Sequence, residues 1–282
     1  MHTVATKAAL RQELKKASQQ GLSIGLVPTM GNLHKGHLAL IEASVRECQF
    51  TVATIFVNPM QFGTNEDLAV YPRTLEQDQQ LLERAGCNLL FTADANEVYG
   101  PDLESGTVVR IPQLSLAYCG KSRPGHFDGV ATIVTKLFNL AAPAKAYFGL
   151  KDFQQFRIIQ QLVEDLDFNL ELRGIPTKRE ASGLAMSSRN NFLTADQRKT
   201  AAGLYATLKY TVEQILTGNR EFRQLESGAA LALSQLGIRP DYLAICNAET
   251  LALATAADSK LVLLAAGFVD SIRLIDNLTV EL

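Results

Sequence analysis

The first two thirds of the chain alternate short apolar runs with longer amphipathic stretches, and this alternation restricts the fold more than any other feature. Short apolar runs predict strands, and amphipathic stretches predict helices. Residues 50–57 are nearly continuously apolar and rich in β-branched and aromatic side chains, which is typical of a parallel strand buried on both faces. Strands are expected at 22–27, 50–57, 88–91, 144–148 and 169–173, and helices at 36–48, 74–85, 127–140 and 152–165. This order predicts an α/β fold, a Rossmann-like doubly wound parallel sheet with right-handed crossovers.

The rhythm changes after Pro176, where Gly, Pro, Ser and Asn interrupt the periodicity. Two helices are expected, at 194–217 and 223–236, followed by strands at 241–246, 260–268 and 271–275 with no helix between them. A tight connection at residues 269–270 would join the last two strands. We therefore predict two domains, residues 1–176 and residues 177–282, of which the second is a smaller α+β domain with an antiparallel sheet.

Composition narrows the class of protein. The chain has 282 residues, of which 47% are hydrophobic and 20% charged, so it can bury a substantial core. Its formal net charge of -2 creates no overall field that would attract nucleic acid or an anionic membrane. No apolar run approaches the roughly 20 residues that span a bilayer, and residues 1–20 are polar and helical in pattern, unlike a signal peptide. A cytoplasmic protein is expected.

The four cysteines lie far apart, and none forms the C-x-x-C pair of a zinc or redox motif. They are Cys48, Cys87, Cys119 and Cys246. We expect buried free thiols in a reducing compartment.

The strongest candidate for a ligand site is the sequence PTMGNLHKGH at residues 28–37, here called the histidine turn. It follows the first predicted strand and opens the first predicted helix, where helix N–H groups and the helix dipole suit a phosphate. Gly31 and Gly36 would let a ligand approach the backbone. His34 and His37 are three residues apart, so both rings can lie on one helix face and donate to phosphate charge in a transition state.

A zinc pair and two surface histidines are the alternative interpretations of this turn. Zinc needs further ligands, but the only other histidines are His2 and His126, and no nearby Cys or Glu completes a set. Nucleotide binding is therefore favoured.

A second cluster, Met186-Ser187-Ser188-Arg189-Asn190, precedes the helix expected at 194–217. Two hydroxyls and a guanidinium suit a polyphosphate. An ordinary loop before a helix capped by Thr194 explains the cluster equally well when it is considered alone. Its occurrence together with the histidine turn favours phosphate binding.

Two further clusters carry weaker signals. Lys151 follows a predicted strand in the sequence FGLKD, where it could direct a compact positive charge at phosphate, whereas the simpler interpretation of Asp152 is a helix cap. The amides of Asn58 and Gln61 follow another strand, and Gln154 and Gln155 begin the next helix. Amides can bind hydroxyl or carboxylate groups, but surface polar residues are the simpler interpretation.

Together these stretches closely resemble the pantothenate synthetase (pantoate–β-alanine ligase) family over nearly the whole chain. The resemblance rests on VPTMGNLHKGH, IFVNPMQF, YPRT, SRPGHFDGVATIV, FGLKDFQQ, GLAMSSRNNFLT and the terminal RLIDN. This family belongs to a superfamily of His-x-Gly-His nucleotidyltransferases. Class I aminoacyl-tRNA synthetases and small nucleotidylyltransferases share its histidine turn and its serine-rich phosphate loop.

The resemblance implies a two-step reaction: pantoate and ATP form pantoyl adenylate and pyrophosphate, and β-alanine then displaces AMP. It implies a nucleotide- and pantoate-binding domain at 1–176 and a C-terminal domain covering the ATP site. His37, His34 and Lys151 would be catalytic. The implied ATP-binding residues are Met30, Gly31, Asn32, Leu33, His34, Lys35, Gly36, His37, Gly149, Leu150, Lys151, Asp152, Lys178, Met186, Ser187, Ser188 and Arg189. Gln61 and Gln155 would bind pantoate, with Gln61 also bordering the β-alanine site, and Val130 would line the gem-dimethyl group.

The resemblance also implies a homodimer and Mg²⁺ bound with ATP through phosphate oxygens and water, without an assigned protein ligand. Asp78 is a candidate for contacting the ligands of the metal rather than the metal itself. The simpler interpretation is a carboxylate on the surface of a helix. Two positions depart from the usual pattern. Leu150 stands where many members have Glu, and Lys178 stands where an aliphatic residue or Met is usual, near the expected adenine site.

Three other functions compete: a nucleotidylyltransferase, a truncated class I synthetase, and a non-catalytic ATP-binding module. The near-neutral charge and the lack of an anticodon-type domain argue against tRNA binding. The presence of both histidines, the lysine and the Ser-Ser-Arg run argues against a non-catalytic module.

Overall fold

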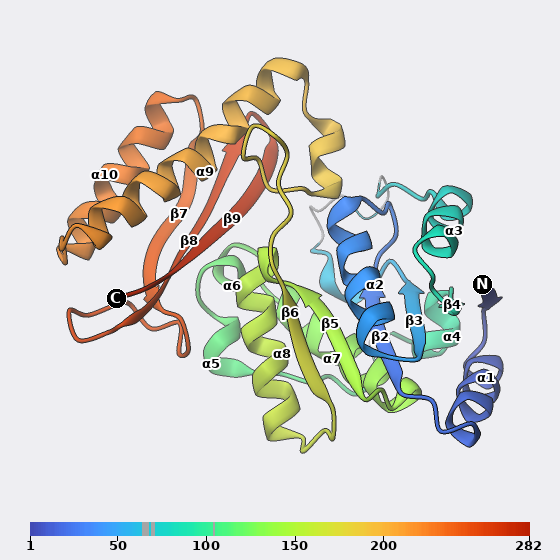
Figure 1. Ribbon diagram of the computed structural model, residues 1–282. Helices are drawn as coiled ribbons and strands as arrows, with labels where there is room; N and C mark the ends of the chain where they lie inside the picture. Colours follow the sequence, from blue (N-terminus) through green and yellow to red (C-terminus); the bar gives the residue numbers. More distant parts are fainter. Residues whose placement is uncertain (64–67, 69–70, 104) are drawn as a thin grey trace. The chain divides into compact units, whose positions relative to one another are not determined.

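The computed structural model describes residues 1–63, 68, 71–103 and 105–282 (Figure 1). The chain divides into two compact units. The N-terminal unit contains residues 1–150 and 155–176, and the C-terminal unit contains residues 151–154 and 177–282.

The N-terminal unit is built on a six-stranded parallel sheet with the order β1-β4-β3-β2-β5-β6. Its strands are β1 (His2–Val4), β2 (Ile24–Thr29), β3 (Phe50–Ile55), β4 (Leu89–Phe91), β5 (Lys145–Gly149) and β6 (Glu171–Ile175). From β2 the chain proceeds to β3 and β4 on one side, and from β5 to β6 on the other. The switch point of this doubly wound sheet therefore lies between β2 and β5, where ligands of such folds bind.

Helices cover both faces of this sheet. They are α1 (Lys7–Gln19), α2 (Lys35–Glu47), α3 (Leu75–Arg84), α4 (Ala95–Tyr99), α5 (Pro112–Ser115), α6 (Cys119–Ser122), α7 (His126–Ala141) and α8 (Phe153–Asp165), with 3-10 turns η1 (Pro59–Gln61) and η2 (Leu150–Asp152). Tyr147 of β5 belongs to the core that contains Ile41 of α2, whereas the adjacent Phe148 packs edge-on against Phe138 of α7, with ring centroids 6.3 Å apart. Because successive side chains of a strand point to opposite faces, α2 and α7 lie on opposite faces of the sheet.

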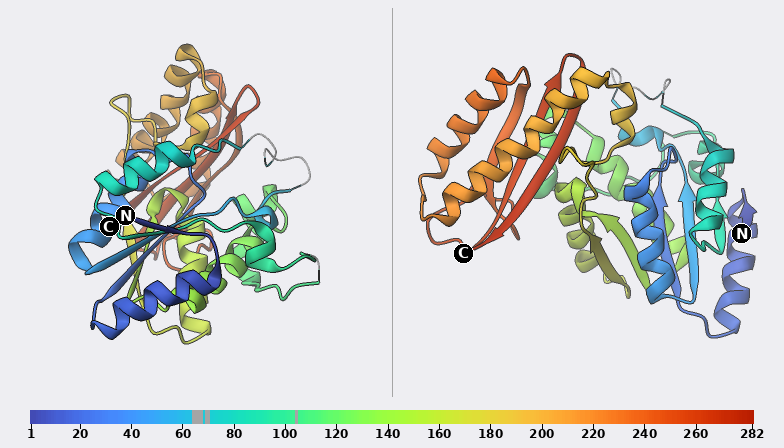
Figure 2. Two further views of the ribbon diagram at one scale, coloured as in Figure 1. Left: turned by 90° about the vertical axis from the view of Figure 1, so that its right-hand side faces the viewer. Right: turned by 45° about the horizontal axis from the view of Figure 1, so that its top comes forward.

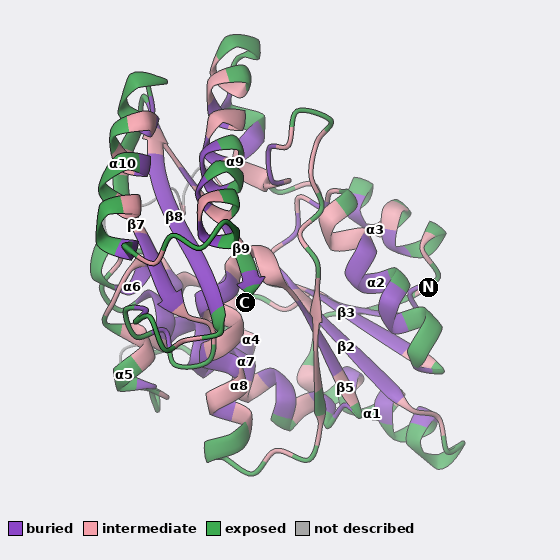
Figure 3. Cartoon of the chain, turned by 60° about the vertical axis from the view of Figure 1, so that its left-hand side comes forward, coloured by how far each residue is buried: buried purple, intermediate pink, exposed green. Residues whose placement is uncertain are grey.

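The C-terminal unit has a three-stranded antiparallel sheet with the order β7-β8-β9. Its elements are η3 (Ser188–Phe192), α9 (Ala195–Leu216), α10 (Phe222–Gln235), β7 (Arg239–Asn247), β8 (Lys260–Val269) and β9 (Ile272–Glu281). Helices α9 and α10 lie side by side against the sheet (Figure 2). Leu261 and Leu263 of β8 share a core with Leu204 and Leu208 of α9, and β8 is buried over nearly its whole length (Figure 3).

The predicted fold class is confirmed by the parallel sheet and the smaller unit with its antiparallel sheet. Two local predictions need correction. Strand β1 forms within residues 1–20, where the sequence indicated only a helix, because it pairs with β4 at the sheet edge. Strand β9 runs to Glu281 rather than ending at residue 275, and the turn before it lies at residues 270–271, with Asp270 at φ 52°. The strand was predicted to end at residue 275 because the polar residues Asp276 and Asn277 interrupt its apolar pattern.

All four cysteines are buried and form no disulfide, as predicted. Burial raises the pKa of the Cys87 thiol to about 11, so this thiol stays protonated near neutral pH. Within the described part of the chain, no helix combines the length and the apolar character needed to cross a membrane.

Candidate active site

The histidine turn connects β2 to α2 in the N-terminal unit. Gly31 and Asn32 adopt left-handed backbone conformations, with φ angles of 80° and 50°. Thr29 holds the start of the turn, because its hydroxyl donates to the carbonyl of Thr54 at 2.6 Å and accepts the N–H of Gly31 at 3.2 Å. The turn therefore departs from β2 in a defined direction.

Asp78 of α3 binds the backbone of this turn. Its Oδ2 accepts the N–H of Asn32 at 2.9 Å, its Oδ1 accepts the N–H of Leu33 at 2.8 Å, and the Thr74 hydroxyl also donates to Oδ2. A Cβ on Gly31 would lie 3.1 Å from Asp78 Oδ2, so glycine suits this position in space as well as in conformation. With 1% of its surface exposed, Asp78 is not the surface carboxylate of the simpler interpretation.

The two predicted histidines lie together at the N-terminus of α2. His34 is the N-cap residue, and its Nδ1 accepts the N–H of Gly36 at 3.1 Å, while His37 Nδ1 accepts the N–H of His34 at 3.4 Å. The rings stack with centroids 4.1 Å apart. Because Nδ1 is an acceptor in both neutral rings, the proton of each ring is on Nε2. Each ring can therefore donate a hydrogen bond from Nε2.

Gln61 is buried and lies beside Met30. Its Nε2 is 3.1 Å from Met30 Sδ, and its Oε1 accepts from Asn58 Nδ2 at 3.1 Å. Asn58 also donates to the carbonyl of Gly129 and accepts from the hydroxyl of Tyr99 at 2.7 Å. Asn58 and Gln61 are 1% and 8% exposed, so the interpretation of these two as surface residues is wrong. Burial raises the pKa of the Tyr99 hydroxyl, which therefore stays a donor to Asn58.

His126 and Arg123 support Gln61 from α7 and the loop before it. His126 Nδ1 lies 2.8 Å from the carbonyl oxygen of Gln61, and Nε2 lies 2.9 Å from Arg123 Nη1. A carbonyl only accepts and a guanidinium only donates, so His126 carries its proton on Nδ1. Sequence reasoning missed Arg123, His126 and Tyr99 as supporting residues. The sequence SRPGHFDG was the available signal for the first two.

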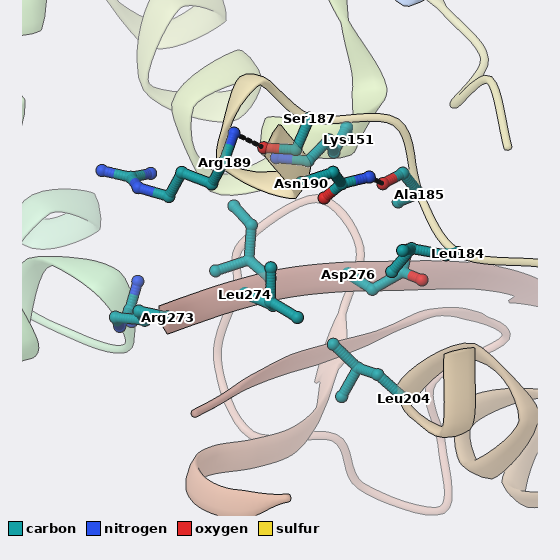
Figure 4. Close-up of a pocket in the computed structure, with 11 residues that line it drawn as sticks. Lys151, Leu184, Ala185, Ser187, Arg189, Asn190, Leu204, Arg273, Leu274 and Asp276 are labelled. Carbon is teal, nitrogen blue, oxygen red and sulfur yellow. Dashed lines mark hydrogen bonds between the residues drawn. The ribbon is translucent and has the colours of Figure 1, made fainter. Parts of the chain in front are cut away.

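The second group of predicted residues forms a pocket within the C-terminal unit. Lys151, Ser187 and Arg189 line it together with Asn190, Arg273 and Asp276 (Figure 4). Lys151 Nζ is 3.7 Å from Asp152 Oδ1, and the Lys151 side chain is 18% exposed. Two predicted clusters far apart in sequence thus meet at one pocket.

Residues 178–190, here called the serine loop, form a small hairpin that ends in η3. The Met186 N–H donates to the Lys178 carbonyl at 2.9 Å, and the Ser187 hydroxyl accepts the N–H of Arg189 at 3.2 Å. The Asn190 amide donates to the Ala185 carbonyl and to Glu180 Oε1, both at 3.0 Å. These bonds fix the backbone that carries Ser187 and Arg189.

A buried ion pair holds the serine loop from β9. Arg179 makes two bonds to Asp276, at 2.6 and 2.9 Å, and also donates to the Gly183 carbonyl at 3.1 Å. Its guanidinium lies over the Tyr205 ring, 3.8 Å from the centroid. Sequence analysis assigned no role to Arg179 or Asp276, although Asp276 lies in the quoted RLIDN motif.

The remaining predicted residues have simpler surroundings. The Leu150 side chain packs over Gly174, where an added Cβ would come within 2.7 Å of Leu150 Cδ2. An apolar residue therefore fits this position. The Lys178 side chain is exposed, while its carbonyl serves the hairpin. Gln154 is buried and Gln155 is half-buried, and Val130 is buried in α7.

The predicted site residues are distributed over both units. The N-terminal unit contains Met30, Gly31, Asn32, Leu33, His34, Lys35, Gly36, His37, Gln61, Gly149, Leu150 and Gln155. The C-terminal unit contains Lys151, Asp152, Lys178, Met186, Ser187, Ser188 and Arg189. Lys151 and Asp152 thus belong by their contacts to the C-terminal unit, although the predicted boundary at residue 176 placed them in the first domain.

A family model described as pantoate-beta-alanine ligase matches residues 2–279. The chain belongs to this family. Its relatives include the pantothenate synthetases of Pseudomonas fluorescens (strain Pf0-1), 50% identical over 282 residues, and of Shewanella amazonensis, 51% identical over 279 residues. The first match covers 100% of this chain and 99% of the relative, and the second covers 99% of each.

Solved structures of this family share the fold. Pantothenate synthetase from Thermus thermophilus superimposes with a TM-score of 0.92 at 44% identity, over 99% of both chains. The pantoate-beta-alanine ligase of Francisella tularensis, solved with β-γ ATP and β-alanine, gives a TM-score of 0.80 at 30% identity, over 99% of this chain and 97% of that one. The predicted family and the predicted ligase activity are confirmed, which decides against a nucleotidylyltransferase, a truncated synthetase and a non-catalytic module.

Proposed function

We propose that this chain condenses pantoate with β-alanine in two steps, using ATP and passing through pantoyl adenylate. The observation that carries the proposal is the stacked His34–His37 pair at the N-terminus of α2, because each ring carries its proton on Nε2. A helix N-terminus with two such donors suits an anion that gains charge during a reaction.

In the first step, a pantoate carboxylate oxygen attacks the α-phosphorus of ATP, and the bond to the bridging oxygen of pyrophosphate breaks. Negative charge then accumulates on the phosphate oxygens. His37 and His34 donate hydrogen bonds to these oxygens, and Lys151 supplies a positive charge. Ser187, Ser188 and Arg189 hold the β- and γ-phosphates. These donors lower the barrier because they bind the transition state more strongly than the substrate.

Pantoate is bound by Gln61 and Gln155 in this proposal. The Gln61 amide is fixed by Asn58, and Met30, which lies beside it, is proposed to contact both pantoate and the nucleotide. The buried Val130 provides an apolar neighbour for the gem-dimethyl group.

In the second step, the neutral amine of β-alanine attacks the acyl carbon of pantoyl adenylate. The carbon–oxygen bond to AMP breaks, and the nitrogen loses a proton as the amide forms. Gln61 borders the β-alanine site in this proposal.

Magnesium is proposed to arrive with ATP, with phosphate oxygens and water as its main ligands. The pocket that contains Lys151, Ser187 and Arg189 offers donors suited to phosphate rather than a set of metal ligands. It also contains Asn190 Oδ1, a buried oxygen without a protein partner, which can accept a hydrogen bond from a metal-bound water. The bound ion would neutralise phosphate charge.

The adenylate mechanism is tested by pantoate-dependent exchange of pyrophosphate into ATP, measured with magnesium and without β-alanine. Exchange should appear at this stage, and AMP and the amide product should form after β-alanine is added. If exchange is absent and AMP never forms with both substrates present, the proposal fails. Sedimentation tests the expected homodimer, and localisation in cells tests the expected cytoplasmic site.

A further inference from the structure

The segment that carries Lys151 belongs to a different unit from the residues on either side of it. Residues 151–154 group with the C-terminal unit, whereas Leu150 and Gln155 group with the N-terminal unit. Strand β5 leads directly into this segment. The segment therefore makes contacts of its own with the C-terminal unit.

One such contact is made by Asn277 of β9. Its Nδ2 donates to the backbone carbonyl of Lys151 at 2.8 Å, over a sequence separation of 126 residues. Asn277 is 7% exposed, and its own backbone is fixed, because its N–H donates to Asp276 Oδ1 at 2.8 Å and its carbonyl accepts from Arg179 at 3.3 Å. A buried amide is costly unless it is hydrogen-bonded, so this geometry favours the bond to Lys151.

Two adjacent residues of β9 thus hold the two segments of the phosphate pocket. Asp276 holds the serine loop through Arg179, and Asn277 holds Lys151. Both segments are therefore attached to the same strand of the C-terminal sheet.

We propose that Asn277 is a positioning residue that keeps Lys151 in register with Ser187 and Arg189, so that these three groups meet the phosphates of ATP together. This inference rests on the proposed function, in which Lys151 acts during adenylation. Asn277 is not proposed to act in the chemistry itself, because its amide binds Lys151 through the backbone carbonyl and not through the ammonium group.

The test is N277L, which keeps the number and branching of the side-chain heavy atoms and removes the donor. Pantoate-dependent pyrophosphate exchange should fall about 10- to 100-fold, the scale of a small misplacement of a reacting group. The loss should be in kcat rather than in the KM for pantoate. The second step, measured with preformed pantoyl adenylate and β-alanine, should be little changed because pyrophosphate has already left.

A double-mutant cycle with K151A separates positioning from general damage. If Asn277 acts through Lys151, N277L together with K151A should exchange pyrophosphate no more than about 3-fold more slowly than K151A alone. Multiplication of the two losses would overturn the proposal, as would an equal loss in both steps.

The matched control is N247L on β7 of the same sheet. Asn247 Nδ2 donates to Asp258 Oδ1 at 2.6 Å, and neither residue lines the pocket, so this variant also loses a partly buried amide hydrogen bond. N247L should keep the wild-type rate of pyrophosphate exchange. If N277L also keeps this rate, the positioning role of Asn277 is contradicted.

Hydrogen exchange provides a second measurement, which N277A can supply if N277L does not fold. Faster exchange of the amides at 151–155, with those of β7 unchanged, supports the proposal, and unchanged exchange at 151–155 refutes it. Failure of the wild-type protein to exchange pyrophosphate would instead refute the proposed function itself.

Discussion

The histidine turn and the serine loop are both irregular segments that carry proposed phosphate donors, and each is held by a buried aspartate. In the histidine turn, Asp78 accepts two backbone N–H groups directly. In the serine loop, Asp276 acts through Arg179, which in turn reaches the carbonyl of Gly183. The first aspartate thus binds the loop backbone, and the second forms a buried ion pair.

The difference follows from what each loop leaves unpaired. The left-handed residues of the histidine turn direct two N–H donors to one place, and a carboxylate satisfies both. The hairpin of the serine loop presents a carbonyl, which requires a donor, so Arg179 of the same loop donates both to this carbonyl and to Asp276. Loss of Asp78 therefore leaves neutral donors unmet, whereas loss of Asp276 leaves a partly buried cation without its partner.

The largest effects on the rate of pyrophosphate exchange are expected when a proposed phosphate donor is removed from each region. H37A and K151A should each lower the rate of pyrophosphate exchange about 100-fold or more, the scale of losing one transition-state donor. H2A is the control, because His2 lies in β1 and is not part of the turn. Turnover near the wild-type level in both variants would remove these roles.

The buried ion pair should give the largest effect on stability. D276A should lower the free energy of unfolding of the C-terminal unit by about 3 kcal/mol, because Arg179 then lacks its charge partner. Urea denaturation followed by a probe in that unit measures this. The exposed pair Lys199–Asp196 provides the control, where D196A should change stability by less than about 0.5 kcal/mol. Equal effects of D276A and D196A would contradict the comparison.

Weakening the contact between Asp78 and the backbone should lower the free energy of unfolding less than the loss of Asp276 does. D78N keeps the shape but retains only one acceptor oxygen, so it should lower stability by about 1–2 kcal/mol and lower pyrophosphate exchange by about 10-fold. The control is E76Q in the same first turn of α3, where the side chain is exposed. An unchanged exchange rate in D78N would show that the turn keeps its geometry without the carboxylate.

The smallest effect is expected at Gln155, in the N-terminal unit and outside both loops. Q155A should raise the KM for pantoate several-fold with little change in kcat, because this residue is proposed to bind substrate before and during the reaction alike. Steady-state kinetics at saturating ATP measures this, with Q161A on the same helix as the control. A pantoate KM equal to that of the wild type would count against the binding role.

Local patterns were sufficient to predict the fold class and to select the candidate phosphate donors. The alternation of apolar runs depends on neighbours in sequence, and it correctly indicated the parallel sheet and the smaller antiparallel unit. The spacing of His34 and His37 likewise placed them on one face of the first turn of α2. Very short elements such as β1 and α5 have too few residues for a pattern to be recognised.

The sequence by itself therefore determined the order of the main elements and which side chains are candidates for binding phosphate. Only the tertiary structure decided how those side chains are held. Asp78 meets the histidine turn across 45 and 46 residues, and Asn277 meets Lys151 across 126. From the sequence alone, a polar residue in a helix or strand is assigned to the surface. Burial of such a residue is tolerated only when a partner supplies the hydrogen bond, and a partner distant in sequence is known only from the tertiary structure.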